Sequence, residues 1–400
     1  MTPDAMIPPR SPRLARRGLL LGGAALALAG CDGAVAQNQQ APATPPATPG
    51  PETLRSLTGL GELARRNGIS FGAAVQTNLL TTDPGYAAAF AAEAAVIVPE
   101  WEGKWAALQP EEGRFDTAPL DGMLRWAQNR GRTVRGHALL WHEDLPGWAE
   151  AALAEGRPRA LAVLGAHMDK VLNHTRPQIR DWDVINEPIA NPTGSDRPQL
   201  DGGALRDTPW LRALGPGYME TALRMARERD ATLRMVLNDY GIEEDVPDAA
   251  EKRRRLLELL RDLLARKAPL DAVGIQGHLH LSRPFTPAPI AAFLAEIRQM
   301  GLAVLVTELD VRETRAAPQD IAARDALVAE RTYAFVSTAL EGGARTVLSW
   351  GLSDKYSWLA NTPAVAIGDG RVHRGLPMDE AWQRKPMWHA LARAFRGGGG

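Results

Sequence analysis

The chain has 400 residues, of which 45% are hydrophobic and 23% are charged, as in a globular protein with a substantial core. Its formal net charge is −1, and it contains no long basic or acidic run. Nucleic-acid-binding proteins usually carry a basic patch or stripe, so the charge argues against that class. The chain has one cysteine, which excludes an internal disulfide.

Residues 1–30 have the layout of an export signal. Their basic part ends in Arg16 and Arg17, and an uncharged stretch follows from Gly18 to Gly30. That stretch is too short to span a bilayer comfortably. The arginine pair followed by Gly-Leu-Leu resembles a bacterial twin-arginine signal. We therefore expect an exported protein.

The motif LAGC at 28–31 resembles a bacterial lipoprotein cleavage box, in which Cys31 is lipidated and becomes the mature N-terminus. The alternative is a simple secretory signal cut elsewhere, with Cys31 incidental. Residues 31–54 are rich in Pro, Ala, Gln and Thr and predict a disordered tether. Residues 397–400 are a glycine tail, so the predicted folded domain is 55–396. We expect a monomeric periplasmic or envelope lipoprotein that contacts the membrane only through its N-terminus.

Short apolar runs alternate with helical patterns such as 251–268 and 290–301. Eight of these runs predict strands, at 71–75, 94–100, 133–140, 181–187, 233–239, 271–278, 303–310 and 345–351. Strands alternating with helices indicate parallel α/β architecture. Eight repeats favour a (β/α)8 TIM barrel, one catalytic domain with enlarged βα loops. A doubly wound open sheet is the alternative, weakened because no glycine-rich phosphate turn follows the first strand.

Polar or aromatic residues collect at the predicted strand ends, where the active site of such a barrel lies: Glu100, Trp101, His137, Asn186, Glu187, Asn238, Asp239, Gln276, His278, Glu308 and Trp350. Glu187 and Glu308 each follow a long apolar run. Two carboxyl groups facing each other across a cleft are what glycoside hydrolysis requires. The alternative for each glutamate is a structural ion pair with a nearby Arg or Lys.

Eight ordered motifs make the resemblance specific: GKWAALQPEEGRFD (103–116), VRGHALLWHEDLPGW (134–148), WDVINEP (182–188), LNDY (237–240), VGIQGHLH (273–280), LVTELDV (305–311), SWGLSDKYSWL (349–359) and KPMWHAL (385–391). With these motifs the chain resembles glycoside hydrolase family 10, the retaining endo-β-1,4-xylanases. The resemblance implies a hydrolase of xylan that forms a covalent glycosyl-enzyme intermediate and needs no cofactor.

Carried over position by position, the resemblance makes Glu187 the general acid/base and Glu308 the nucleophile. Asn186 matches the residue that binds the sugar 2-hydroxyl, and His278, with Gln276 beside it, matches the histidine that hydrogen-bonds the nucleophile. The remaining implied sugar-binding residues are Glu100, Lys104, His137 and Trp141 on the glycone side and Trp350 and Trp358 as floor and lid. Behind these, we expect Asp310, Asn238 and Tyr240 as supporting residues.

Three positions depart from the family pattern: Trp101 and Asp144 on the glycone side, where the family has Asn and Gln, and Gly241 on the leaving-group side, where it has Asn. They leave a related or decorated β-glycan, or a bacterial exopolysaccharide, open as the substrate. A non-catalytic glycan-binding protein is a further alternative. His278 and His280 could also be read as metal ligands, but the resemblance explains His278 without a metal. Trp126 and Trp388 are expected in the core.

Overall fold

The computed structural model describes residues 58–193, 195 and 203–397. All of them belong to the unit that runs from Pro49 to Gly400. The predicted export signal, Cys31 and the tether lie outside these residues, as does most of the glycine tail. No helix in the described part of the chain is both long and apolar enough to cross a bilayer.

Eight parallel strands close into a barrel. In chain order the strands are β1 Ser70–Val75, β2 Val96–Pro99, β3 Thr133–Gly136, β4 Ile179–Asn186, β5 Arg234–Asp239, β6 Ala272–Ile275, β7 His278–His280, β8 Ala303–Arg312 and β9 Thr346–Ser349. Strands β1 to β6 pair in sequence, β6 pairs with β8, and β8 reaches β1 through β9. The remaining strand, β7, is not one of the eight barrel strands; it pairs with the carboxyl end of β8, beyond the part that pairs with β6. The predicted (β/α)8 TIM barrel is confirmed.

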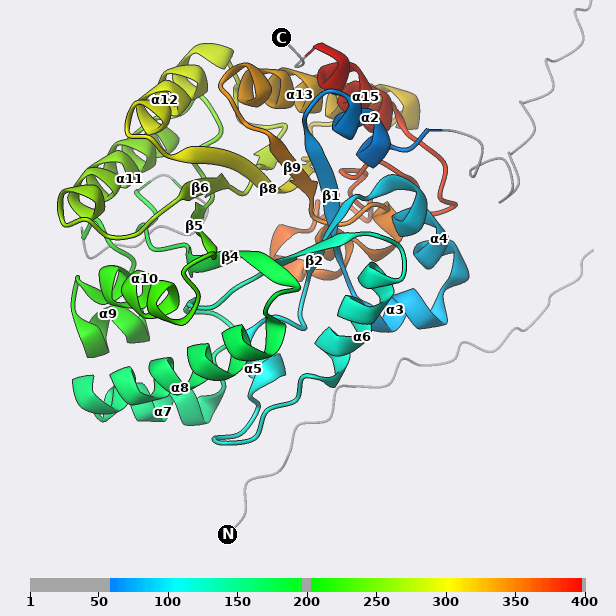
Figure 1. Cartoon of the computed structure of the whole chain (residues 1–400). Coiled ribbons are helices and arrows are strands. Elements are labelled where there is room, and N and C mark those ends of the chain that lie inside the picture. The colour runs from blue at the N-terminus through cyan, green and yellow to red at the C-terminus, as the bar shows by residue number, and fades with distance from the viewer. Residues whose placement is uncertain (1–57, 194, 196–202, 398–400) are drawn as a thin grey trace, which may run out of the picture. The chain divides into compact units, whose positions relative to one another are not determined.

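Helices surround the strands, as Figure 1 shows. They are α2 Leu60–Arg66, α3 Thr77–Thr82, α4 Pro84–Glu93, α5 Trp105–Leu108, α6 Ala118–Gln128, α7 Gly147–Ala154, α8 Arg157–Thr175, α9 Pro209–Leu214, α10 Tyr218–Arg229, α11 Pro247–Ala265, α12 Pro287–Gln299, α13 Ile321–Glu341, α14 Trp358–Asn361 and α15 Pro386–Gly397, with 3₁₀ turns η1 Asp354–Tyr356 and η2 Pro363–Val365.

Local sequence explains where several helices begin. Asp83 accepts hydrogen bonds from the first amides of α4, and Asp320 does so for α13. Helix α11 carries its predicted amphipathic pattern: Leu256 and Leu260 are fully buried, while Arg254 is exposed. Such helices cover the outer face of the barrel and leave the strand ends to form the site.

Strand β4 packs its tryptophan against a position that must be glycine. Trp182 is fully buried, and a Cβ on Gly136 of β3 would lie 2.0 Å from its ring. Because backbone and indole approach so closely, β4 is locked in register beside β3. The core also holds Trp126 and Trp388, as predicted. This packing fixes the position of β4 along the barrel axis, and with it the position of Glu187 at the end of the strand.

Candidate active site

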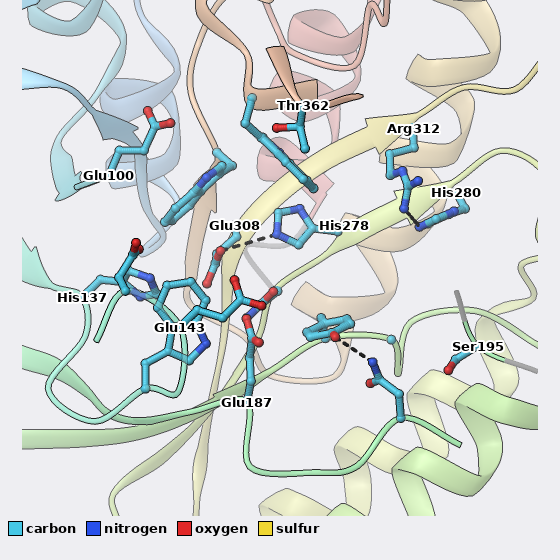
Figure 2. Close-up of a pocket in the computed structure, with 18 of the residues that line it drawn as sticks. Glu100, His137, Glu143, Glu187, Ser195, His278, His280, Glu308, Arg312 and Thr362 are labelled. Carbon is cyan, nitrogen blue, oxygen red and sulfur yellow. Dashed lines mark hydrogen bonds and ion pairs between the residues drawn. The ribbon is translucent and has the colours of Figure 1, made fainter. Parts of the chain in front are cut away.

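A cavity of about 640 Å³ opens at the carboxyl ends of the strands. Figure 2 shows how side chains from different strands point into it. Ten of the predicted site residues line it: Glu100, Lys104, His137, Trp141, Glu187, Gln276, His278, Glu308, Trp350 and Trp358. Tyr240, predicted to lie behind them, lines the cavity as well. Asn186 is 3% exposed; its Oδ1 accepts from Asn238 Nδ2 of β5 at 2.8 Å, and its Nδ2 lies 3.4 Å from Glu187 Oε1.

Glu187 stands immediately after β4, where the backbone turns out of the strand. Its φ is 56°, a left-handed conformation that is uncommon for a residue other than glycine. The Glu187 amide donates to the Asn238 carbonyl at 2.7 Å. Its Oε1 accepts from Gln276 Nε2 at 3.1 Å and lies 3.4 Å from Asn186 Nδ2. The carboxyl group is 8% exposed, so it is aimed into the cavity by buried donors.

Glu308 lies within β8 and faces the same cavity. Its amide donates to the Gln276 carbonyl at 2.7 Å. Its Oε1 accepts from Asn238 Nδ2 at 2.7 Å, and its Oε2 lies 3.4 Å from His278 Nε2. Asn238 of β5 and Gln276, which directly follows β6, thus each contact both glutamates through backbone or side chain. Neither glutamate is paired with an Arg or Lys side chain among the described residues, which removes the structural ion-pair alternative for them.

A glycine makes the Asn238 contact with Glu308 possible. A Cβ on Gly274 of β6 would lie 2.3 Å from Asn238 Oδ1. That oxygen accepts from Thr307 Oγ1 at 2.6 Å, and Nδ2 reaches Asn186 Oδ1 at 2.8 Å. The amide of Asn238 is therefore oriented by hydrogen bonds on both of its ends.

His278 connects Glu308 to Asp310. Its Nδ1 lies 2.9 Å from Asp310 Oδ1, and Trp358 Nε1 donates to Asp310 Oδ2 at 2.6 Å. Burial lowers the pKa of His278, but the carboxylates of Asp310 and Glu308 outweigh it and hold that pKa well above its usual value. The ring is therefore an imidazolium at neutral pH, and both of its nitrogens donate towards carboxylates.

A second buried network holds His137. Its Nδ1 lies 2.9 Å from Asp183 Oδ2, and the Arg135 guanidinium binds both oxygens of Asp183. Asp183 is fully buried. Burial alone would raise its pKa, but Arg135 and His137 reverse the effect and lower it. Asp183 is therefore an ionised partner that orients His137 towards the cavity.

Lys104 has three close neighbours, and we name these four residues the Lys104 cluster: Lys104, Trp101, Trp141 and Asp144. The Lys104 ammonium lies 3.2 Å from Asp144 Oδ2, 4.3 Å from the Trp101 ring centroid and 4.8 Å from the Trp141 centroid. Trp101 is 49% exposed at the cavity rim. Two of the three departures from the family pattern therefore contact the same lysine.

Glu100 lies next to this cluster at the end of β2. It is 7% exposed, and its Oε2 accepts from Gln76 Nε2 at 3.0 Å. Burial raises the pKa of Glu100 to about 7, against the opposing effects of Gln76 and Lys104. This wall of the cavity thus contains a carboxyl group that changes charge near neutral pH.

On the opposite side, a buried lysine lies below Tyr240. Lys252 Nζ contacts Asp239 Oδ1 at 2.9 Å and Asn191 Oδ1 at 2.8 Å, and lies 3.9 Å from the Tyr240 ring centroid. Gly241, the third departure, has φ of 69°, and a Cβ there would reach Lys252 at 3.7 Å. Because Gly241 has no side chain, no atoms project into the cavity from this position.

The two histidines of the HLH motif have different partners. His278 faces Asp310 and Glu308, whereas His280 Nε2 lies 3.1 Å from Arg312 NH1. A guanidinium beside one ring nitrogen does not suit a metal pair. Within the described residues, a group of possible ligand atoms within 4.8 Å of one another occurs elsewhere, at His142, Glu143 and Glu187. It includes the predicted acid, so it belongs to the same site.

Sequence inspection missed Arg135, Gln76, Arg206 and Lys252 as parts of the site. Arg206 Nε donates to the Glu187 carbonyl at 2.9 Å, although it lies in a long loop with no motif. Arg135 lies within β3, and the one sequence signal for it is a charged residue inside a predicted strand. The hydrogen bonds of these residues to Glu187, Glu100, Asp181 and Asn191 span 19 to 61 positions, and such contacts leave no local pattern.

The sequence model of glycosyl hydrolase family 10 matches residues 59–394, nearly the whole described barrel. The chain belongs to glycosyl hydrolase family 10. It is 31% identical over 339 residues to endo-1,4-beta-xylanase 1 of Humicola insolens, covering 83% of this chain and 73% of that protein. It is 32% identical over 300 residues to endo-1,4-beta-xylanase A of Fusarium oxysporum, covering 73% and 84%.

Solved structures of xylanases share this fold. Xylanase 10B of Thermotoga petrophila, crystallised with xylobiose, aligns with a TM-score of 0.73 at 25% identity, covering 86% of this chain and 99% of that one. Endo-1,4-beta-xylanase XylE of Penicillium canescens aligns with a TM-score of 0.73 at 27% identity, covering 85% and 98%. Membership of the family makes this protein a glycoside hydrolase.

Proposed function

We propose that the protein is a retaining endo-β-1,4-xylanase. The observation that carries the proposal is the pair Glu187 and Glu308, which share one cavity and are positioned by the same two residues, Asn238 and Gln276. The xylanase names of its relatives support xylan as the substrate. Trp141, Trp350 and Trp358 line the cavity and suit sugar rings, whose faces are apolar and whose rims carry hydroxyls.

In the first step Glu308 attacks the anomeric carbon, and the bond to the leaving oxygen breaks. Asn238 and the His278 imidazolium contact the two oxygens of Glu308 and orient it for attack. Glu187 gives its proton to the leaving oxygen. Because Oε1 of Glu187 already accepts from Gln276, the proton belongs on Oε2. In the second step Glu187 takes a proton from water, the water oxygen attacks the anomeric carbon, and Glu308 leaves.

The test is release of reducing sugar by the purified chain from about residue 52 onward. The panel contains plain xylan, glucuronate-decorated xylan, other β-1,4-glycans and bacterial exopolysaccharides, with Glu308→Ala as the blank. Cleavage of xylan into short oligomers is the expected result. Cleavage of another glycan alone would reassign the substrate to one selected by the Lys104 cluster. Turnover by Glu308→Ala equal to wild type would remove Glu308 as the nucleophile.

We also propose that the mature enzyme is a monomer anchored in a bacterial envelope through Cys31. The support is the sequence: the Arg16–Arg17 pair, the short apolar stretch and the LAGC box. Expression of the full chain and of Cys31→Ser in a bacterial host, followed by membrane fractionation, tests the anchor. Wild type in the membrane fraction and the variant in the soluble fraction is the expected result; equal distribution contradicts it. Gel filtration of the soluble part tests the monomer.

A further inference from the structure

The indole N–H of Trp358 is used inside the protein. It donates to Asp310 Oδ2 at 2.6 Å, while the other oxygen of Asp310 lies 2.9 Å from His278 Nδ1. Asp310 is fully buried. A chain of contacts therefore runs from the tryptophan at the cavity wall through Asp310 and His278 to Glu308.

The segment that carries Trp358 is fixed from several sides. Asp354, four residues earlier, binds Lys385 Nζ at 2.6 Å and the Leu376 amide at 3.1 Å. Tyr356 Oη donates to Asp83 Oδ2 at 2.7 Å, and Leu359 is 1% exposed. The contacts of Asp354, Tyr356 and Leu359 thus set the direction of the Trp358 N–H without a bound sugar.

The carboxylates of Asp310 and Glu308 both contact the imidazolium of His278. Asp310 attracts the His278 ring through Nδ1, and Glu308 attracts it through Nε2. A hydrogen bond to a carboxylate stabilises its negative charge and weakens its pull on other donors. The Trp358 N–H therefore reduces the hold of Asp310 on His278 and leaves the Nε2–H better placed for Glu308.

We propose that Trp358 is a positioning residue for the nucleophile: its N–H on Asp310 sets how the His278 imidazolium is divided between Asp310 and Glu308. The proposal rests on the proposed function, because it takes Glu308 as the group that attacks the sugar. It gives Trp358 a role beyond contact with the substrate, since its effect reaches kcat and the pH profile as well as KM.

The test replaces Trp358 by Phe, which keeps an aromatic ring and removes the N–H. Trp350→Phe is the matched control, since it removes an indole N–H from the same cavity without touching Asp310. We expect Trp358→Phe to lower kcat about tenfold, the effect of one hydrogen bond to a charged group. The acid limb of kcat/KM should move to higher pH because ionised Glu308 is less stabilised. Trp350→Phe should raise KM and leave the pH profile in place.

Asp310→Asn and the double variant with Trp358→Phe show whether the effect passes through Asp310. Once Asp310 is neutral, removal of the indole N–H should add little to the pH shift. Full additivity of the two shifts, or a Trp358→Phe profile that superimposes on wild type, overturns the proposal. Thermal melting verifies that each variant is folded.

A measurement without turnover separates this proposal from the proposed function. In protein labelled with ¹⁵N-histidine, the Nδ1–H resonance of His278 should move in Trp358→Phe and stay in place in Trp350→Phe. If wild type cleaves no glycan, the proposed function fails, but this resonance still decides whether Trp358 acts on His278. An unchanged resonance overturns the positioning role.

Discussion

The catalytic centre and the Lys104 cluster lie in one cavity but are built differently. Glu187 and Glu308 are held by Gln276, which follows β6, and Asn238 of β5, and both of these side chains are buried. Lys104 is held by Trp101 and Asp144, which lie in loops after β2 and β3 and are themselves exposed or half-exposed. A substitution in a barrel strand disturbs the packing of its neighbours, whereas loops tolerate substitutions and insertions more easily.

This contrast explains where the chain departs from its family. The departures that the resemblance implies, Trp101, Asp144 and Gly241, all lie after strand ends, and two of them contact Lys104. We therefore expect the strand-held residues to carry the proposed chemistry and the loops to set which sugar residues bind next to it.

The largest effect is expected at Glu187. Glu187→Gln keeps the side-chain size and removes the acid, so hydrolysis of the polymer should fall about 10²–10⁴-fold. A nitrophenyl glycoside needs no protonation of its leaving group. Its first turnover should therefore stay fast and appear as a burst of nitrophenol. An equal loss on both substrates would show that Glu187 does not act as the acid.

Asp183 links the two regions, because it lies on β4 and orients His137 in the wall near Lys104. Asp183→Asn leaves the fully buried Arg135 short of a counter-charge and should lower the free energy of unfolding by about 3–5 kcal/mol. Asp181→Asn removes the partly exposed partner of the same arginine and should cost less than about 1 kcal/mol. Urea unfolding of both variants measures the difference; similar losses would contradict it.

Glu100 should make stability depend on pH. Burial raises its pKa from 4.5 to about 7, so in that window the folded protein binds more protons than the unfolded chain. Stability therefore falls as pH rises from about 4.5 to 7, by about 3 kcal/mol from this group. Relative to wild type, Glu100→Gln should gain that amount between pH 4 and pH 8 in urea unfolding. A difference that is the same at both pH values would show that Glu100 titrates normally.

The smallest effect is expected at Trp101. Trp101→Ala removes a ring that lies over the Lys104 ammonium at an exposed site, a contact worth about 0.5–1 kcal/mol. KM for long oligosaccharides should rise about two- to fivefold, while a short nitrophenyl glycoside that does not reach the cluster should be hydrolysed as by wild type. A comparable change on the short substrate would place Trp101 in contact with the reacting sugar.

Much of the fold followed from the pattern of the sequence. All eight predicted strands occur, because strands buried on both faces are continuous apolar runs that the sequence displays directly. The run at 271–278 is divided, however: β6 ends at Ile275, and β7 starts at His278. Gly277, with φ of 79°, interrupts the strand there. Pairing of β7 with the far end of β8 depends on the length of β8 and could not be read locally.

The site was less predictable than the fold. Glu187 and Glu308 stood out because carboxylates at the ends of apolar runs need a special environment. The contact of Asp144 with Lys104 and that of Arg135 with Asp183 join residues 40 and 48 positions apart, on different strands or loops. They follow from barrel closure, which brings strand ends together irrespective of spacing.

The left-handed backbone at Glu187 has a consequence for evolution. A residue with a Cβ at φ of 56° is held there against its own preference, whereas glycine or asparagine adopts this conformation readily. Random substitution at this position can therefore yield a more robust barrel that is catalytically dead. Selection for stability alone would favour replacement of Glu187, so a glutamate at this position fits its proposed role as the acid.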